Sequence, residues 1–181
     1  MTKSRSELTP FSHVILALVG EGGAGPHDLA RMMRTGGSVY WSAARSQYYA
    51  EPRRLEKHAY LKSTKEPGQT TERTRYTLTA KGRRALVDWL SQPAHFPRIQ
   101  SEPTIKLLSA DLADDATVLH SLRGLRSEIA DISARLEEAE ANAASLQHRV
   151  RYLRLNHHLA RAILHAHLDW LDAVEEELGE H

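Results

Sequence analysis

Residues 43–78 read AARSQYYAEPRRLEKHAYLKSTKEPGQTTERTRYTL. This stretch decides the fold because it changes from a helical pattern to a strand pattern. We expect a helix over Ala43 to Tyr60, in which Leu55 lies on the apolar face. Pro52 predicts a kink in this helix, or a regular part that begins near Ala50, because proline lacks an amide proton and clashes with the preceding turn.

The second half of the stretch predicts a β-hairpin. Leu61 to Glu66 reads as one strand, Pro67 to Thr70 as a turn, and Arg73 to Leu78 as a second strand. Strict alternation in the second strand places Tyr76 and Arg75 on opposite faces.

Helices are expected on both sides of this stretch. Thr9-Pro10 begins a helix that runs to about Val19, and Gly25-Pro26 begins a second one after a glycine-rich turn. Thr79 caps a further helix over Ala80 to Leu90. The order helix, helix, helix, strand, strand, helix is that of a winged helix-turn-helix, whose third helix enters a major groove of DNA.

The charge of the chain is divided unevenly. The 181 residues carry a net charge of +1. They include no cysteine, and this absence excludes disulfide scaffolds, thiolate catalysis and cysteine-based metal sites. Residues 1–92 hold 15 basic and 8 acidic side chains, whereas residues 93–181 hold 9 and 15. This division predicts a DNA-binding domain over 1–92, a proline-containing linker over 93–103 and a helical dimerisation domain over 104–181.

Polar and basic side chains of the third helix and the hairpin are the candidate DNA contacts, because they offer donors to base edges and phosphates. These residues are Arg45, Ser46, Gln47, Tyr48, Tyr49, Arg53, Arg54, Lys57, Lys65, Arg73 and Arg75. Three alternatives stay open: the basic residues serve only solubility, Arg54 pairs with Glu51, or a tyrosine of the pair Tyr48-Tyr49 belongs to the core.

Three motifs carry a family resemblance. Ser46 to Leu61 (SQYYAEPRRLEKHAYL), Arg75 to Gly82 (RYTLTAKG) and Gly25 to Leu29 (GPHDL) resemble the third helix, second wing strand and second helix of the PadR family of bacterial transcriptional regulators. The resemblance covers residues 9–92 and implies a homodimeric repressor, often autoregulatory, that a small molecule or another signal releases from its operator. The sequence departs from the family pattern at Pro52, Ala59 and Tyr60.

The second half predicts long amphipathic helices. A short helix is expected over Thr104 to Ala110, and a much longer one begins at Asp114-Asp115 and breaks near Asn142 to Ser145. Apolar residues repeat there in steps of three and four, which is typical of a coiled-coil seam. We expect the seam to join two protomers through Leu122, Leu125, Ile129, Ile132, Leu136, Leu164, Leu171, Val174 and Leu178.

The remaining features predict no catalysis. No nucleophile elbow, zinc-protease motif or dinucleotide fingerprint occurs, and the histidines of the last helix do not share a ligand geometry, so we expect no enzyme, cofactor or metal site. Histidines on the seam, His157 and His167, are a hypothetical source of pH-sensitive dimer packing. Trp89, Trp170 and Tyr152 are either core residues or the lining of an effector pocket between the two domains.

The chain is therefore expected to be a mainly α, dimeric, sequence-specific DNA-binding regulator in the cytoplasm, since no stretch approaches the ~20 apolar residues of a bilayer span. Its expected partners are an inverted-repeat operator in double-stranded DNA, a second copy, and possible small-molecule effectors, without a membrane. The alternative is a protein-interaction module with a basic winged domain and a helical dimerisation arm.

Overall fold

The computed structural model describes residues 8–67, 72–143 and 146–179. It divides the chain into two compact units, Met1–Arg34 with Trp41–His95 and Thr35–Tyr40 with Phe96–His181. The change at residues 95 and 96 lies inside the proline-containing segment 91–103. Residues 68–70 of the expected hairpin turn lie outside the described residues.

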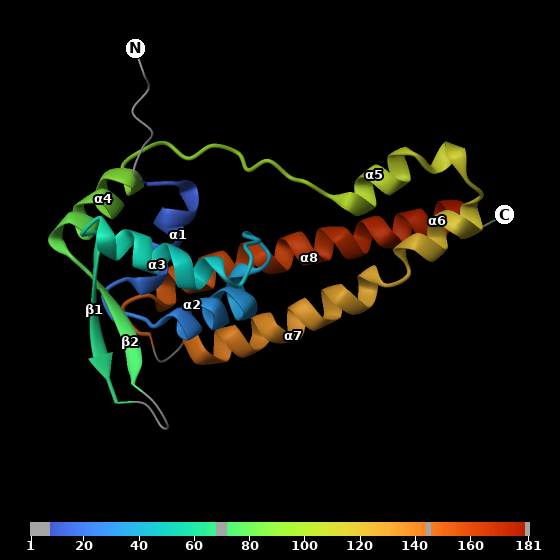
Figure 1. Cartoon of the computed structure of the whole chain (residues 1–181). Helices are drawn as coiled ribbons and strands as arrows, with labels where there is room; N and C mark the ends of the chain where they lie inside the picture. The colour runs from blue at the N-terminus through green and yellow to red at the C-terminus, as the bar shows by residue number, and fades with distance from the viewer. Residues whose placement is uncertain (1–7, 68–71, 144–145, 180–181) are drawn as a thin grey trace, which may run out of the picture. The chain divides into compact units, whose positions relative to one another are not determined.

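The first unit is the winged helix-turn-helix that the sequence predicts (Figure 1). Its elements are α1 (Pro10–Val19), α2 (Pro26–Met32), α3 (Gln47–Lys57), β1 (Leu61–Glu66), β2 (Arg73–Leu78) and α4 (Ala80–Leu90). A π-helical turn, Met33–Gly37, follows α2, and its residues from Thr35 onward belong to the second unit.

Helix α3 begins at Gln47, three residues before the position that Pro52 alone suggested. The amides of Tyr48 and Tyr49 bond to carbonyl oxygens three residues earlier, on Arg45 and Ser46, so a tight turn starts the helix. Pro52 then lies inside α3 with its ring fully buried. Burial of this ring against the core offsets the amide hydrogen bond that proline cannot make.

The hairpin is joined by a third short stretch of backbone. Strands β1 and β2 pair antiparallel, with Leu61 opposite Leu78. Ala24, in the glycine-rich turn after α1, exchanges two backbone hydrogen bonds of 3.0 Å with Tyr76 of β2. Gly23 must be glycine here, because its φ is +71° and an added Cβ would lie 2.8 Å from the Tyr76 carbonyl oxygen.

One hydrophobic core holds the first unit together. The side chains that are almost fully buried come from α1, α2, α3, β1 and β2, and include Ile15, Leu16, Leu29, Leu55, Leu61 and Tyr76. Each of these helices therefore buries one face and leaves the other to solvent.

A left-handed residue and one close approach define the junction of α3, β1 and α4. Ala59 adopts a left-handed φ of 60° where the chain turns from α3 into β1. Gly82 of α4 lies so close to the Tyr60 carbonyl that an ideal Cβ would come within 2.1 Å of its oxygen. The turn thus uses a strained alanine, and α4 uses a glycine that cannot be replaced without movement.

The second unit is entirely helical in its described part. Its elements are α5 (Glu102–Leu108), the 3-10 turn Ala110–Leu112, α6 (Asp115–Leu122), α7 (Leu125–Ala143) and α8 (Val150–Gly179). The expected break after residue 142 is confirmed by the end of α7, although residues 144–145 lie outside the described residues. A further interruption at residues 123–124, which was not expected, separates α6 from α7.

Helices α6 and α7 pack against α8, which runs back alongside them (Figure 1). The apolar seam is consequently buried inside one protomer. The nine residues expected to join two protomers all belong to this core or pack against it: Leu122, Leu125, Ile129, Ile132, Leu136, Leu164, Leu171, Val174 and Leu178. The chain thus folds back and supplies a partner helix itself, and a role of these residues between two copies stays a prediction.

Polar contacts accompany this packing. Arg126 of α7 binds two carboxylates of α8, those of Asp172 and Glu175. His157, one of the seam histidines, is buried near the carboxylate of Glu140, and burial lowers its pKa, an effect that Glu140 opposes and Arg161 reinforces. This histidine therefore faces the interior of its own protomer.

No described helix is long and apolar enough to cross a membrane. Within the described ranges, no group of three or more histidine, aspartate, glutamate or cysteine side chains is arranged to hold a metal ion.

Candidate nucleic-acid interface

Helix α3 is held to the core along one edge. Tyr48, Pro52 and Leu55 follow one another at steps of four and three residues, and all three are buried. The Tyr48 ring meets Phe11 of α1 edge to face, with centroids 5.4 Å apart. The opposite face of α3 must therefore point to solvent.

The exposed face carries the polar residues that a DNA reader needs. The exposed candidates on and just before α3 are Arg45, Ser46, Gln47, Arg53 and Lys57. The carboxamide of Gln47 can both donate a hydrogen bond to a base edge and accept one from it. The cations can bind phosphates or guanine.

Two candidates of the same helix are less accessible than these. Tyr48 is only 5% exposed, so it is a core residue and leaves no surface for DNA. Arg54 is bound by the carboxylate of Glu51, with Nε to Oε2 at 2.8 Å and Nη2 to Oε1 at 2.6 Å. Tyr49 is partly buried against the core and keeps some exposed surface. The sequence left these alternatives open because helical spacing alone does not say which face turns inward.

The C-terminal half of α3 is tied to the hairpin. Glu56 accepts hydrogen bonds from the backbone amide of Ser63, at 3.1 Å, and from its hydroxyl. Arg53 donates to the buried hydroxyl of Tyr76; burial and the charge of Glu56 raise the pKa of this tyrosine, and Arg53 opposes them. Helix and hairpin thus form one rigid surface.

The hairpin presents further cations. Arg73 and Lys65 are exposed, and Lys65 Nζ donates to the hydroxyl of Thr74 at 3.0 Å. Arg75 is half-buried; it donates to the carbonyl oxygen of Gly22 and lies 3.6 Å from a carboxylate oxygen of Glu66. Arg73 and Lys65 therefore offer more accessible charge than Arg75 does.

A further cation on this surface was missed in the sequence. Lys62 is exposed on β1 and lies opposite Thr77, while Thr64 lies opposite Arg75 and Glu66 opposite Arg73. Because alternate positions share a face, Lys62 belongs to the same outer face as the two arginines. Only the strand register reveals this, and the register depends on a turn length that the sequence pattern did not define.

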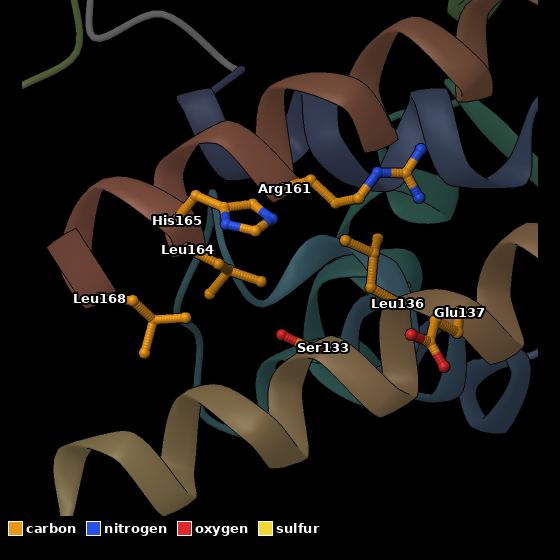
Figure 2. A pocket seen from close by; sticks show the side chains of 7 residues that line it. All are labelled: Ser133, Leu136, Glu137, Arg161, Leu164, His165 and Leu168. Carbon is orange, nitrogen blue, oxygen red and sulfur yellow. The ribbon is translucent and has the colours of Figure 1, made fainter.

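A separate pocket of about 240 Å³ lies between α7 and α8 in the second unit (Figure 2). Its lining combines leucines with polar side chains: Ser133, Leu136, Glu137, Arg161, Leu164, His165 and Leu168. The three aromatic residues considered for an effector pocket do not line it. Trp89 and Tyr152 are exposed, and Trp170 packs against the helical core.

Comparison with known proteins finds relatives along most of the chain. No family model matches it. The negative transcriptional regulator PadR of Bacillus subtilis (strain 168) is 26% identical over 139 residues, which cover 74% of this chain and 76% of that protein.

Solved structures of such proteins share the fold. B. subtilis PadR in complex with operator DNA has a TM-score of 0.74 at 19% identity, covering 94% of this chain and 98% of the other. The same protein with p-coumaric acid has a TM-score of 0.57 at 18% identity, covering 91% and 98%. The PadR-like transcriptional regulator BC1756 of Bacillus cereus has a TM-score of 0.77 at 19% identity, covering 97% and 99%. The likeness extends over both units, not over the winged unit alone.

Proposed function

We propose, since the chain belongs to the PadR family of transcriptional regulators, that it is a sequence-specific DNA-binding repressor. The observation that carries the proposal is the polar and basic surface formed by the exposed face of α3 and the outer residues of the hairpin. The core residues Tyr48, Pro52 and Leu55 turn that face outward, and Glu56 fixes the hairpin beside it. A relative of the same fold has been solved on operator DNA.

The proposed contacts divide into two groups. Gln47 and Arg53 read base edges, because they lie on the exposed face of the helix that enters the major groove. The other contacts hold the phosphate backbone, and they are Arg45, Ser46, Tyr49, Lys57, Lys62, Lys65, Arg73 and Arg75. Tyr48 belongs to neither group because it is buried in the core, and Arg54 belongs to neither because Glu51 binds it.

The proposed regulator is a homodimer on an inverted repeat, because two-fold symmetric proteins read two half-sites about one helical turn apart. Since the apolar seam is consumed within each protomer, the contact between copies falls to apolar side chains that stay exposed on the second unit. On the first half of α8 these are Val150, Tyr152, Leu155 and Leu159. The seam residues keep this surface in place because they pack α7 against α8.

Regulation by a small molecule is part of the proposal. A relative has been solved in complex with p-coumaric acid. We propose that an organic effector releases this chain from DNA. The site of that effector is not assigned. We further propose that the chain acts in the cytoplasm and is not an enzyme, in keeping with relatives that are transcriptional regulators.

Fluorescence anisotropy tests the DNA reading directly. The purified protein is titrated into a duplex from immediately upstream of its own gene and into a shuffled duplex, at two salt concentrations. We expect a preference of at least ~10³-fold for the native duplex and a steep salt dependence. Weak and equal binding to both duplexes, also across a genomic library of fragments, would refute the proposal in favour of a protein-interaction module.

Two substitutions separate the proposed roles. Arg73→Ala removes a phosphate contact, so affinity falls on both duplexes and the slope of log K against log salt becomes shallower by ~0.9. Gln47→Ala removes a base contact, so affinity falls by ~1–3 kcal/mol on the native duplex only. Equal losses on both duplexes for both variants would contradict this division.

A further inference from the structure

A buried serine links α1 to α3 in the first unit. Ser12 lies on the inner face of α1 with Ile15, Leu16 and Val19, and its exposed fraction is 0%. Its hydroxyl donates to Glu51 Oε1 of α3 at 2.6 Å and accepts from Arg54 Nη2 of α3 at 2.9 Å. Alanine would fill this position by packing alone, so the hydroxyl points to a specific role in joining the two helices.

Glu51 and Arg54 complete a cluster with this serine. Both carboxylate oxygens of Glu51 bind the guanidinium of Arg54, which lies three residues later on α3, in a bidentate ion pair. The Glu51 side chain is 14% exposed and that of Arg54 35%. Burial opposes ionisation of Glu51, but the hydrogen bonds from Arg54 and Ser12, with the positive charge of Arg54, prevail and lower the pKa of the carboxyl. The pair is thus charged and held against α1.

The serine is fixed from its other side as well. Thr9, the N-cap of α1, donates its backbone amide to Ser12 Oγ at 2.8 Å, and the Ser12 amide donates to Thr9 Oγ1 at 3.2 Å. This reciprocal cap holds the first turn of α1 in one geometry. The Ser12 hydroxyl that meets Glu51 and Arg54 is therefore also held by the first turn of its own helix.

The cluster matters because the buried side chains of α3 form a single line, beside which Tyr49 adds only a partly buried contact. Tyr48, Pro52 and Leu55 run along one edge of the helix, and a helix held along one line can roll about its axis. Contacts on both flanks of this line prevent rolling. Glu56 and Arg53 supply the flank toward the hairpin, and Glu51 with Arg54 supplies the flank toward α1.

We propose that Ser12, Glu51 and Arg54 form a polar clamp that sets the roll angle of α3, and that Ser12 and Glu51 are positioning residues for operator reading. The inference rests on the proposed DNA-binding function and names no further contact with DNA. A roll of α3 displaces every side chain of its exposed face together. Base contacts need fixed donor geometry, whereas phosphate contacts tolerate displacement, so the clamp governs selectivity more than general affinity.

The clamp predicts that the variant Glu51→Gln affects the two DNAs differently. Operator affinity falls, because α3 loses its charged tie to α1. Affinity for shuffled DNA stays equal or rises, because the winged unit loses one negative charge and Arg54 loses its carboxylate partner. A protein that is merely destabilised loses both affinities with its folded fraction.

The test compares Ser12→Ala, Glu51→Gln and the double variant with wild type by anisotropy at one salt concentration. The probes are a duplex that wild-type protein protects from nuclease and its shuffled form. Asp88→Asn is the matched control, since Asp88 is an exposed acid on α4 of the same unit. We expect the ratio of the two affinities to fall about tenfold for Glu51→Gln and in the same direction for Ser12→Ala, which is the size of one misplaced base contact. The double variant should lose no more than the larger single loss.

Hydrogen exchange provides a readout without DNA. The amides of α3 should exchange faster in Ser12→Ala and Glu51→Gln than in Asp88→Asn, while those of α4 should be unchanged. An unchanged affinity ratio, parallel losses on both duplexes, or unchanged exchange in α3 would each overturn the clamp. If wild type itself does not distinguish the duplexes, the DNA function fails; faster exchange confined to α3 would still support the clamp as a tie between the two helices, and the absence of that change would overturn the clamp as well.

Discussion

Gly82→Ala is the substitution with the most direct structural prediction. The added Cβ would lie 2.1 Å from the carbonyl oxygen of Tyr60 and 3.0 Å from its carbonyl carbon. Carbon and oxygen atoms in contact rest at roughly 3.3 Å, so backbone must move by about 1 Å. No flexible side chain can move aside to relieve this contact, since both atoms belong to the main chain of Tyr60.

The Tyr60 carbonyl is also a hydrogen-bond acceptor, which raises the cost of moving it. It accepts from the amide of Thr79 at 3.1 Å and from the Thr79 hydroxyl at 3.1 Å. The same hydroxyl caps α4 by accepting from the Gly82 amide at 3.0 Å. Overpacking costs ~1–3 kcal/mol and loss of a cap ~1 kcal/mol, against less than ~1 kcal/mol gained by replacing glycine in a helix. We expect a net loss of about 2–3 kcal/mol in the unfolding free energy of the first unit.

The assay is thermal and urea unfolding followed by tryptophan fluorescence. Every variant carries Trp170→Phe, so that the signal comes from Trp41 and Trp89 of the first unit. A loss of this size lowers Tm by roughly 10–20 °C in a domain of this length. Gly22→Ala is the control, because nothing lies within 4 Å of the Cβ it would add. Two variants within about 0.5 kcal/mol of each other would refute the close approach of α4 to the Tyr60 carbonyl.

Three further predictions concern both units. Leu171→Ala should lower the unfolding free energy by ~2–5 kcal/mol, since Leu171 is 1% exposed, whereas Leu155→Ala should leave it within ~0.5 kcal/mol and weaken self-association. Urea unfolding with sedimentation velocity checks this, and an equal loss of stability in both variants would contradict the assignment of Leu171 to the core of one protomer. Burial lowers the pKa of His157 below its value in the unfolded chain, so this residue makes stability fall as pH drops below about 6.5. His157→Leu should reduce the change in urea midpoint between pH 5 and 7. An unchanged pH dependence of the midpoint would show that His157 does not cause it. Ala59→Gly should raise Tm by a few degrees, since glycine relieves ~1–2 kcal/mol of left-handed strain but costs part of that in unfolded-chain entropy; a lower Tm would show that the turn is not strained.

The winged unit was predictable because its pattern leaves few alternatives. Alternation in Arg73 to Leu78 defines a half-buried strand, and Thr79 marks the start of the next helix within one residue. Which polar side chains of α3 are free to contact DNA was not predictable. A basic residue three positions after an acidic one can bind it or DNA equally well, and only Ser12, 39 residues before Glu51, decides that Arg54 turns to its neighbour.

The second unit shows a different limit of sequence patterns. Steps of three and four residues predict that one helical face is covered, and that face is indeed buried at Leu122, Leu136 and Leu171. The pattern is the same whether the cover is another chain or the same chain folded back. The break after Ala143 was expected, yet its consequence, an intramolecular hairpin of α7 and α8, needed the structure.

The segment Thr35–Tyr40 has a consequence for how such a chain can be cut or recombined. It belongs to the second unit although the residues on both sides belong to the first, so the backbone passes from one unit to the other three times. Val39 packs on the helical core there, and the Tyr40 hydroxyl donates to the Asn156 carbonyl oxygen of α8. A fragment that ends at residue 95 keeps residues 35–40 without the helices on which they pack. Residues 96–181 transplanted onto another winged domain lack residues 35–40. Because the second unit is built from two separate stretches of sequence, exchange of whole domains between relatives at the linker carries a penalty that proteins with one continuous stretch per domain do not have.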